Sequence, residues 1–85
     1  MNVRIRLFAS MAEAAGTREV AVELRPPAVA SDAFDAVAAR HPKLAPFRDR
    51  ALYAVNAAYA EPLTPLVDGD EVALIPPVSG GATCS

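Results

Sequence analysis

The sequence lacks most of the residues that an active site or a metal centre would require. It contains one histidine, His41, and one cysteine, Cys84, so no pair of these residues stands at metal-ligand spacing and no disulfide can form within the chain. The lone histidine also leaves no convincing set of serine, histidine and aspartate for nucleophilic catalysis. We therefore expect no bound metal or cofactor, and a protein that is not catalytic alone.

Clustered positive charge and long apolar runs are missing as well. The formal net charge is −2 and the only lysine is Lys43, which argues against a nucleic-acid surface. No apolar run approaches the length of a membrane span, and Arg4 and Arg6 interrupt the region where a signal peptide would need an apolar core. These absences predict a cytoplasmic protein without nucleic-acid or membrane partners.

Apolar residues make up 53% of the 85 residues, which indicates one folded domain. Apolar and polar residues alternate in residues 2–8 and again in 19–24, which predicts two strands that pair antiparallel. Further strands are expected over 51–60, with a turn near 56–58, and over 71–75, and helices over 10–15 and 32–40. This order predicts an α+β roll with one main helix on one face of a sheet.

Several residues have expected roles in this fold. Ser31 is expected to cap the main helix, and Pro42 is expected to end it. Leu63 and Leu66, in the connection before the last strand, are candidate core residues. The carboxylates within residues 68–71 are expected at a turn and in solvent.

Two large apolar residues fall on strand faces that otherwise carry charge. Phe8 continues the polar face of the first strand, and Ile75 shares a face with Glu71 in the last strand. Two interpretations of Phe8 stay open: its side chain bends inward at the end of the strand, or it contacts a partner protein.

The chain changes character after residue 75. Pro76-Pro77 cannot continue a hydrogen-bonded ladder and favours an extended exit from the sheet. Small residues follow, with Gly80-Gly81 among them, and glycine lets a backbone enter a narrow channel because it has no Cβ. We therefore divide the chain into a domain over residues 1–78 and a flexible tail over 79–85.

Two motifs near the C-terminus and two short segments near the N-terminus can be compared with known families. They are Leu66-x-Asp68-Gly69-Asp70-Glu71-Val72, Pro76-Pro77-Val78-Ser79-Gly80-Gly81, Leu7-Phe8-Ala9 and Glu13-Ala14-Ala15-Gly16. In these motifs the chain resembles the MoaD/ThiS family of ubiquitin-like sulfur carriers, and within it the small subunit of molybdopterin synthase. The resemblance implies a β-grasp (ubiquitin-like) roll, in which a mixed sheet of four to five strands has its first and last strands parallel in the middle.

The resemblance also implies a chemistry for the tail. In this family a MoeB-like adenylyltransferase, related to ubiquitin-activating enzymes, uses ATP to adenylate the carboxylate of the last glycine. Sulfur then replaces AMP, and the tail delivers it in the active site of the MoaE-like large subunit, where two carriers donate sulfur to a cyclic pyranopterin phosphate. Carried over by position, Gly81 holds the thiocarboxylate and Gly80 gives the tail clearance. The residues implied in partner contact are Phe8, Ile75, Pro76, Pro77 and Val78.

Two departures from the family pattern bear on this reading. Ala12 precedes Glu13 where the family usually carries an arginine, and residues 82–85 cover the carboxylate of Gly81. As written, the chain is an inactive precursor that a protease must cut to expose Gly81, the front piece of a longer polypeptide, or a member that has lost the reaction. The alternative functions are a sulfur carrier for thiamine, cysteine or tRNA thiolation, and a non-catalytic β-grasp adaptor.

Overall fold

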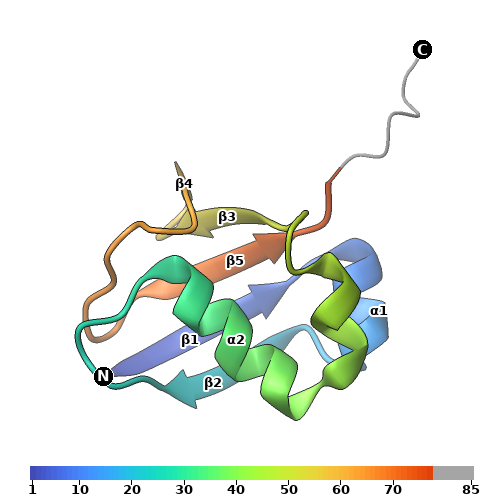
Figure 1. The fold of residues 1–85 in the computed structure, drawn as a ribbon, viewed down its shortest axis with the longest axis horizontal. Helices are drawn as coiled ribbons and strands as arrows, with labels where there is room; N and C mark the ends of the chain where they lie inside the picture. Colours follow the sequence, from blue (N-terminus) through green and yellow to red (C-terminus); the bar gives the residue numbers. More distant parts are fainter. Residues whose placement is uncertain (78–85) are drawn as a thin grey trace.

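A computed structural model describes residues 1–77 as a five-stranded sheet with its helices packed on one face (Figure 1). The elements are β1 (Asn2–Leu7), α1 (Ala9–Ala15), β2 (Glu19–Glu23), α2 (Ala30–Arg40), the 3-10 helix η1 (Pro42–Phe47), β3 (Leu52–Val55), β4 (Ala58–Ala60) and β5 (Glu71–Ile75). Val78, Gly80 and Gly81 belong to residues 78–85, which lie outside the described residues. Among residues 1–77, no helix has the length and apolar character needed to cross a membrane.

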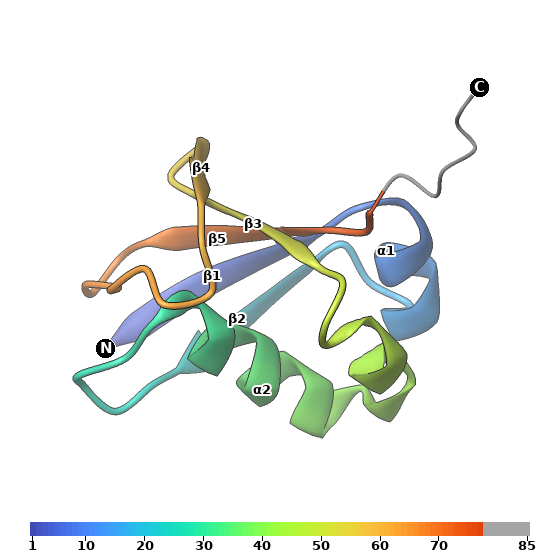
Figure 2. The same ribbon diagram turned by 45° about the horizontal axis from the view of Figure 1, so that its top comes forward.

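The strands lie in the order β2-β1-β5-β3-β4. β1 pairs antiparallel with β2, as the alternating patterns predicted, and pairs parallel with β5, with Leu7 opposite Leu74. β3 pairs antiparallel with both β5 and β4. Figure 2 shows α2 lying across one face of this sheet. First and last strands parallel in the middle of a mixed sheet, with a helix across one face, is the β-grasp arrangement, and that prediction is confirmed.

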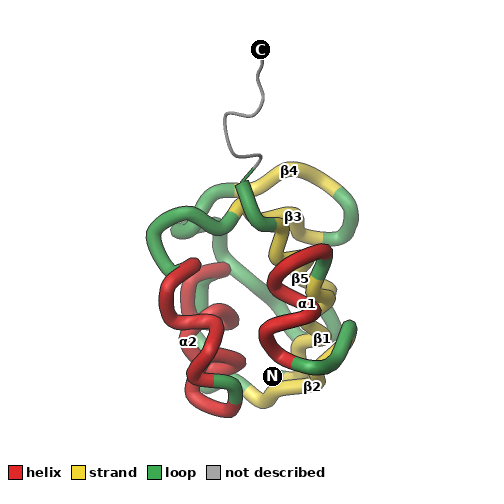
Figure 3. Tube along the Cα trace, turned by 90° about the vertical axis from the view of Figure 1, so that its right-hand side faces the viewer, coloured by secondary structure: helices red, strands yellow, loops and turns green. Residues whose placement is uncertain are grey.

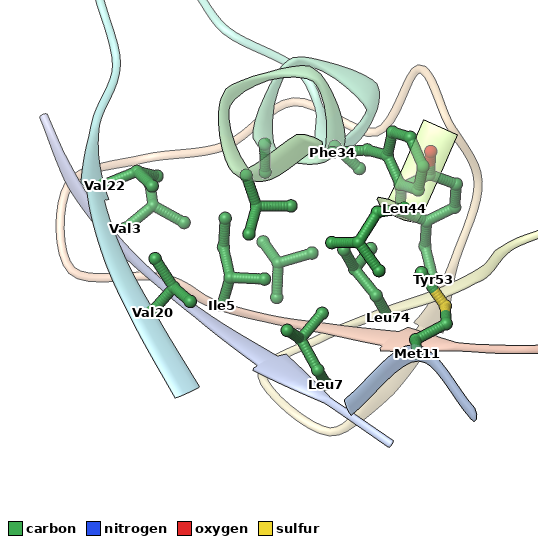
Figure 4. Close-up of a cluster of buried hydrophobic side chains, with 14 of the residues drawn as sticks. Val3, Ile5, Leu7, Met11, Val20, Val22, Phe34, Leu44, Tyr53 and Leu74 are labelled. Atoms are coloured by element: carbon green, nitrogen blue, oxygen red, sulfur yellow. The ribbon is translucent and has the colours of Figure 1, made fainter. Parts of the chain in front are cut away.

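The core lies between the sheet and the helices because alternate strand residues point to the helical face. In β1 these are Val3, Ile5 and Leu7, which are buried as the alternation predicted. Figure 4 shows these side chains meeting residues from the helices and from the neighbouring strands. The other residues labelled in this view are Met11, Val20, Val22, Phe34, Leu44, Tyr53 and Leu74, and the same cluster includes Ala30, Ala33, Val37, Leu66 and Val72.

The start of α2 differs from the sequence prediction. The N-cap residue is Val29 and not Ser31. The carboxylate of Asp32 accepts a hydrogen bond from the Val29 N–H at 2.8 Å, and the Ser31 N–H donates to the Pro62 carbonyl at 2.8 Å. Because a loop carbonyl satisfies this first-turn donor, no serine cap is needed. At the other end α2 stops at Arg40, so the prediction that Pro42 ends it is confirmed.

The two leucines before β5 behave differently from each other. Leu66 is buried in the core as predicted, whereas Leu63 keeps 76% of its surface exposed, so its assignment to the core was wrong. A turn closes between Glu61 and Thr64, with the Thr64 hydroxyl accepting from the Glu61 N–H at 2.9 Å and the Thr64 N–H donating to the Glu61 carbonyl at 3.0 Å. This turn holds Leu63 at its apex, outside the core.

The turn before β5 is tied to the beginning of the chain. Gly69 has φ +90°, a left-handed conformation that glycine adopts without strain. Its N–H donates to the Asn2 carbonyl at 2.8 Å, and the Asp68 carboxylate accepts from the Asn2 N–H at 2.6 Å. These bonds fix where β5 starts relative to β1.

Asp70 is a buried polar residue and not a solvent-exposed one, which corrects the prediction for this carboxylate. It is only 8% exposed and accepts two hydrogen bonds, from Asn56 Nδ2 at 2.9 Å and from the Val67 N–H at 2.8 Å. The Asn56 side-chain oxygen in turn accepts from the Glu71 N–H at 3.1 Å. Asn56 lies in the turn between β3 and β4, so this network joins that hairpin to the start of β5.

Asp70→Ala is expected to lower the free energy of unfolding by about 2 kcal/mol, because it leaves the Asn56 amide and the Val67 N–H without their acceptor in a buried position. Urea unfolding followed by circular dichroism measures this change. Asp49→Ala, at an exposed position, is the matched control and is expected to stay within about 0.5 kcal/mol of wild type. Equal effects of the two substitutions would contradict a structural role for Asp70.

Candidate partner-docking site

Phe8 directly follows β1 and stays outside the core. Its backbone is extended (φ −123°, ψ 150°), and its N–H donates to the Leu74 carbonyl of β5 at 3.3 Å. The side chain keeps 42% of its surface exposed, so the interpretation in which Phe8 bends inward is wrong. The Arg6 guanidinium lies over the phenyl ring, 5.8 Å from its centroid, where a cation is attracted to the ring face. The structure thus presents Phe8 at the surface of the sheet.

Ile75 occupies the matching position at the end of β5. The parallel register sets Leu7 opposite Leu74. Phe8 is the next residue after Leu7 and Ile75 the next after Leu74, so the two lie side by side at the ends of neighbouring strands. Ile75 is half-buried and pairs with Leu52 of β3. Because Leu74 points into the core, Ile75 and Leu52 lie on the face of the sheet that the helices leave open.

Tyr59 of β4 lies on the same open face, and the sequence analysis assigned it no role. The register joins Tyr59 to Ala54 of β3, and Ala54 to Ala73 of β5. Tyr59 is 78% exposed. The pattern could have placed it there, since strand alternation fixes its face once the order of β5, β3 and β4 is known. We call the apolar residues of this open side the docking face: Phe8, Leu52, Ala54, Tyr59, Ala73 and Ile75.

The docking face adjoins the point where the chain leaves the sheet. Pro76 and Pro77 follow Ile75 directly and are half-buried. β1 and β5 run parallel, so their C-terminal ends, and α1 after β1, gather at one end of the molecule (Figures 1 and 3). Whatever contacts the docking face is therefore next to the start of the C-terminal segment.

Ion pairs border the docking face along β1. Arg4 Nε lies 3.1 Å from Glu19 Oε2, and Arg6 Nε lies 3.5 Å from Glu71 Oε2. The arginine side chains are more than half exposed, so each pair contributes on the order of 1 kcal/mol or less to stability. Their arrangement leaves the apolar part of the face flanked by balanced charge.

The described residues offer little that could perform acid–base or metal chemistry. Within residues 1–77 no three histidine, cysteine, aspartate or glutamate side chains are grouped to hold a metal ion. Burial raises the pKa of Tyr53 above its ordinary value, Arg48 opposes this change and Asp49 adds to it. Tyr53 lines a hollow of about 250 Å³ beside the Arg48–Asp35 ion pair. Its neutral phenol there is part of the core and not of the docking face.

The two faces of the sheet are expected to respond differently to substitution. Leu74→Ala, on the buried face, should lower the free energy of unfolding by about 3 kcal/mol because it opens a cavity. Tyr59→Ser, on the docking face, should change it by less than about 0.5 kcal/mol because the ring is mostly in water. Thermal or urea unfolding of both variants measures this. A loss above about 2 kcal/mol for Tyr59→Ser would show that the ring belongs to the folded core.

Comparison with known proteins gives consistent similarities over nearly the whole chain. The model of the ThiS family matches residues 5–81. The chain is 39% identical over 83 residues to the molybdopterin synthase sulfur carrier subunit of Chlamydomonas reinhardtii, covering 95% of this chain and 100% of that protein. It is 37% identical to the human protein of the same name, covering 94% of each chain. The crystal structure of small archaeal modifier protein 1 from H. volcanii superposes with a TM-score of 0.83 at 34% identity, covering 91% of this chain and 98% of that one.

Proposed function

The chain belongs to the ThiS family, and we propose that it is the sulfur carrier subunit of a molybdopterin synthase. The observation that carries the proposal is the similarity, over nearly the full length of both chains, to proteins of that name from an alga and from humans. The docking face beside the exit of β5 supports it, because a carrier needs a surface that aligns its C-terminal segment with a partner. In this proposal residues 1–77 bind the partner proteins, and those proteins supply the catalytic groups.

The chemistry proposed for the tail belongs to Gly81. A carboxylate oxygen of Gly81 attacks the α-phosphorus of ATP in the adenylyltransferase, pyrophosphate leaves, and an acyl-adenylate forms. A hydrosulfide ion then attacks the acyl carbon, AMP leaves, and loss of a proton gives the thiocarboxylate. Activation to a mixed anhydride is needed because a free carboxylate is a poor acyl donor. Gly80 has no Cβ, so the backbone next to Gly81 can enter a narrow channel in the partner's site.

The docking face is proposed to hold the large synthase subunit. Phe8 and Tyr59 are aromatic residues with large exposed areas, the kind that dominate binding energy in interfaces. Ala54 and Ala73 share the row of Tyr59 in the register and are small, so a partner's side chains can approach the sheet closely there. Ile75, Pro76 and Pro77 continue the contact toward the tail, with Val78 next in sequence.

Changing both Phe8 and Ile75 to Asp is expected to abolish binding of the large subunit, because two buried charges without partners would have to be accommodated in an apolar contact. Isothermal titration calorimetry measures the binding, and circular dichroism checks the fold. Leu63→Asp is the matched control, since Leu63 is exposed but lies in the loop that packs on the start of α2. Wild-type affinity in the double variant would eliminate this docking face.

A chain ending at Gly81 is expected to support exchange of pyrophosphate into ATP by the adenylyltransferase, and the 85-residue chain is not. The peptide bond from Gly81 to Ala82 withholds the carboxylate that must attack ATP. Exchange of radiolabelled pyrophosphate measures the difference. We propose that a protease performs this cut in the cell.

A chain ending at Ala82 serves as the control for the cut position, because it has a free carboxylate on a residue that carries a Cβ. It should exchange far less than the chain ending at Gly81. Equal exchange by the 85-residue chain would mean that Ser85 is activated, and would overturn the assignment of Gly81.

A second candidate function is favoured by the similarity to small archaeal modifier protein 1. An amine of another protein can attack the same acyl-adenylate in place of sulfur, so that AMP and a proton leave and an amide joins the two proteins. Sulfur carriers for thiamine, cysteine or tRNA thiolation would use the same carboxylate chemistry. Mass spectrometry of the purified native protein separates these outcomes: an oxygen-to-sulfur exchange identifies a sulfur carrier, and covalent protein conjugates identify a modifier.

A further inference from the structure

A hollow of about 330 Å³ opens beside the docking face, between the end of β1, α1 and the turn that leads into β2. Phe8 and Ala12 form part of its wall, and three charged residues, Arg6, Glu13 and Arg18, line it as well. Phe8 therefore belongs both to this hollow and to the docking face. A partner that covers Phe8 also covers the hollow.

Arg18 and Glu13 are the two charged residues of the hollow that take part in no ion pair in the described part of the chain, and Arg18 is the positive one. The ion pairs within residues 1–77 join Arg4 to Glu19, Arg6 to Glu71 and Arg48 to Asp35. The Arg18 backbone is nevertheless anchored, since its carbonyl accepts from the Leu7 N–H at 2.8 Å. The Arg18 side chain is exposed, so the N–H donors of its guanidinium are accessible to a partner.

Arg6 adds a second guanidinium, and its contact with Glu71 does not use the terminal NH2 groups. Its contact with Glu71 uses Nε at 3.5 Å, a distance longer than a normal hydrogen bond. Side-chain hydrogen bonds from arginine in residues 1–77 come from Arg40, Arg48 and Arg50. The guanidinium of Arg18 therefore offers a planar donor pair next to an aromatic wall, and the terminal NH2 groups of Arg6 add further donors, an arrangement that matches a carboxylate.

We infer that this hollow receives a carboxylate side chain of the subunit that docks over Phe8, with Arg18 as its main partner. The inference rests on the proposed function, because it assigns the occupant to the same docking subunit. The lining carries two positive side chains and one negative one. Glu71 balances the charge of Arg6, so the preference for an acidic occupant over a basic one comes from the donors of Arg18, which has no ion-pair partner within residues 1–77. Ala12 contributes only a methyl group, which leaves room for the entering side chain.

The test uses the full carrier chain and the purified large synthase subunit, with affinity measured by titration calorimetry at low and at high salt. Arg18→Gln is expected to weaken binding on the order of tenfold at low salt, because it removes a charge-assisted hydrogen bond. The loss should shrink as salt screens the pair. Arg25→Gln is the matched control: Arg25 is exposed and follows the other end of β2, so the same change in net charge should alter affinity by less than about twofold.

Glu13→Gln identifies the charge of the occupant. With a carboxylate in the hollow, removal of this neighbouring negative charge should leave the affinity unchanged or increase it. A weakening comparable to that expected for Arg18→Gln would mean a basic occupant and would overturn the inference. Equal losses for Arg18→Gln and Arg25→Gln would show only long-range attraction and would overturn it as well.

The Phe8→Asp variant distinguishes this inference from the function on which it rests. Loss of binding for Phe8→Asp with wild-type affinity for Arg18→Gln would overturn the occupant of the hollow and leave the docking face in place. If the wild-type chain fails to bind the large subunit at all, the proposed function and this inference both fail.

Discussion

The parallel pairing of β1 with β5 is the interaction on which the other features of the molecule depend. It joins the two ends of the domain in the middle of the sheet, with four residue pairs from Arg4 opposite Glu71 to Leu7 opposite Leu74. One face of these strands supplies the centre of the core, and the other supplies the docking face. Because the strands run in the same direction, Phe8 and the exit of the chain after Ile75 lie at the same end. A slip of one residue in this pairing would move the buried side chains of one strand to the open face and its exposed side chains to the core.

The register of that pair is secured by polar contacts at the opposite end of the sheet. Asn2 bonds to Asp68 and Gly69, which sets the start of β5 against the start of β1. Asp70 and Asn56 then hold the β3–β4 hairpin to the same point. The apolar core makes this pairing stable and disfavours a slip of one residue, and these directional bonds also disfavour a slip of two residues, which would leave the same side chains on the buried face. By holding the β3–β4 hairpin, these bonds also place Tyr59 on the docking face, and this placement does not require a partner.

Local sequence patterns predicted the helices and strands well, but predicted the contacts of the loops and helix ends poorly. Alternation identified β1, β2 and their buried residues, because the period of a strand depends only on neighbouring positions. The cap of α2 and the buried Asp70 were missed because each depends on a contact with a loop distant in sequence. The exposed Leu63 was missed because the local turn from Glu61 to Thr64 was not recognised. The parallel pairing itself came from family resemblance and not from the residues. For the site, the alternation singled out Phe8 and Ile75, whereas Tyr59 needed the strand order.

The make-up of the docking face balances two opposing requirements. A carrier has to bind a partner through apolar area, yet large exposed apolar patches promote self-association. Here Tyr59 shares its row with Ala54 and Ala73, which are small and let another surface approach closely. Phe8 lies in the next row, beside the half-buried Ile75 and Leu52. Ion pairs along β1 border this region and disfavour uncharged, unspecific contacts. In the docking that we propose, apolar contact supplies affinity and the charged residues at the edge of the face select the partner. Of these, Arg18 and Glu13 take part in no ion pair within residues 1–77.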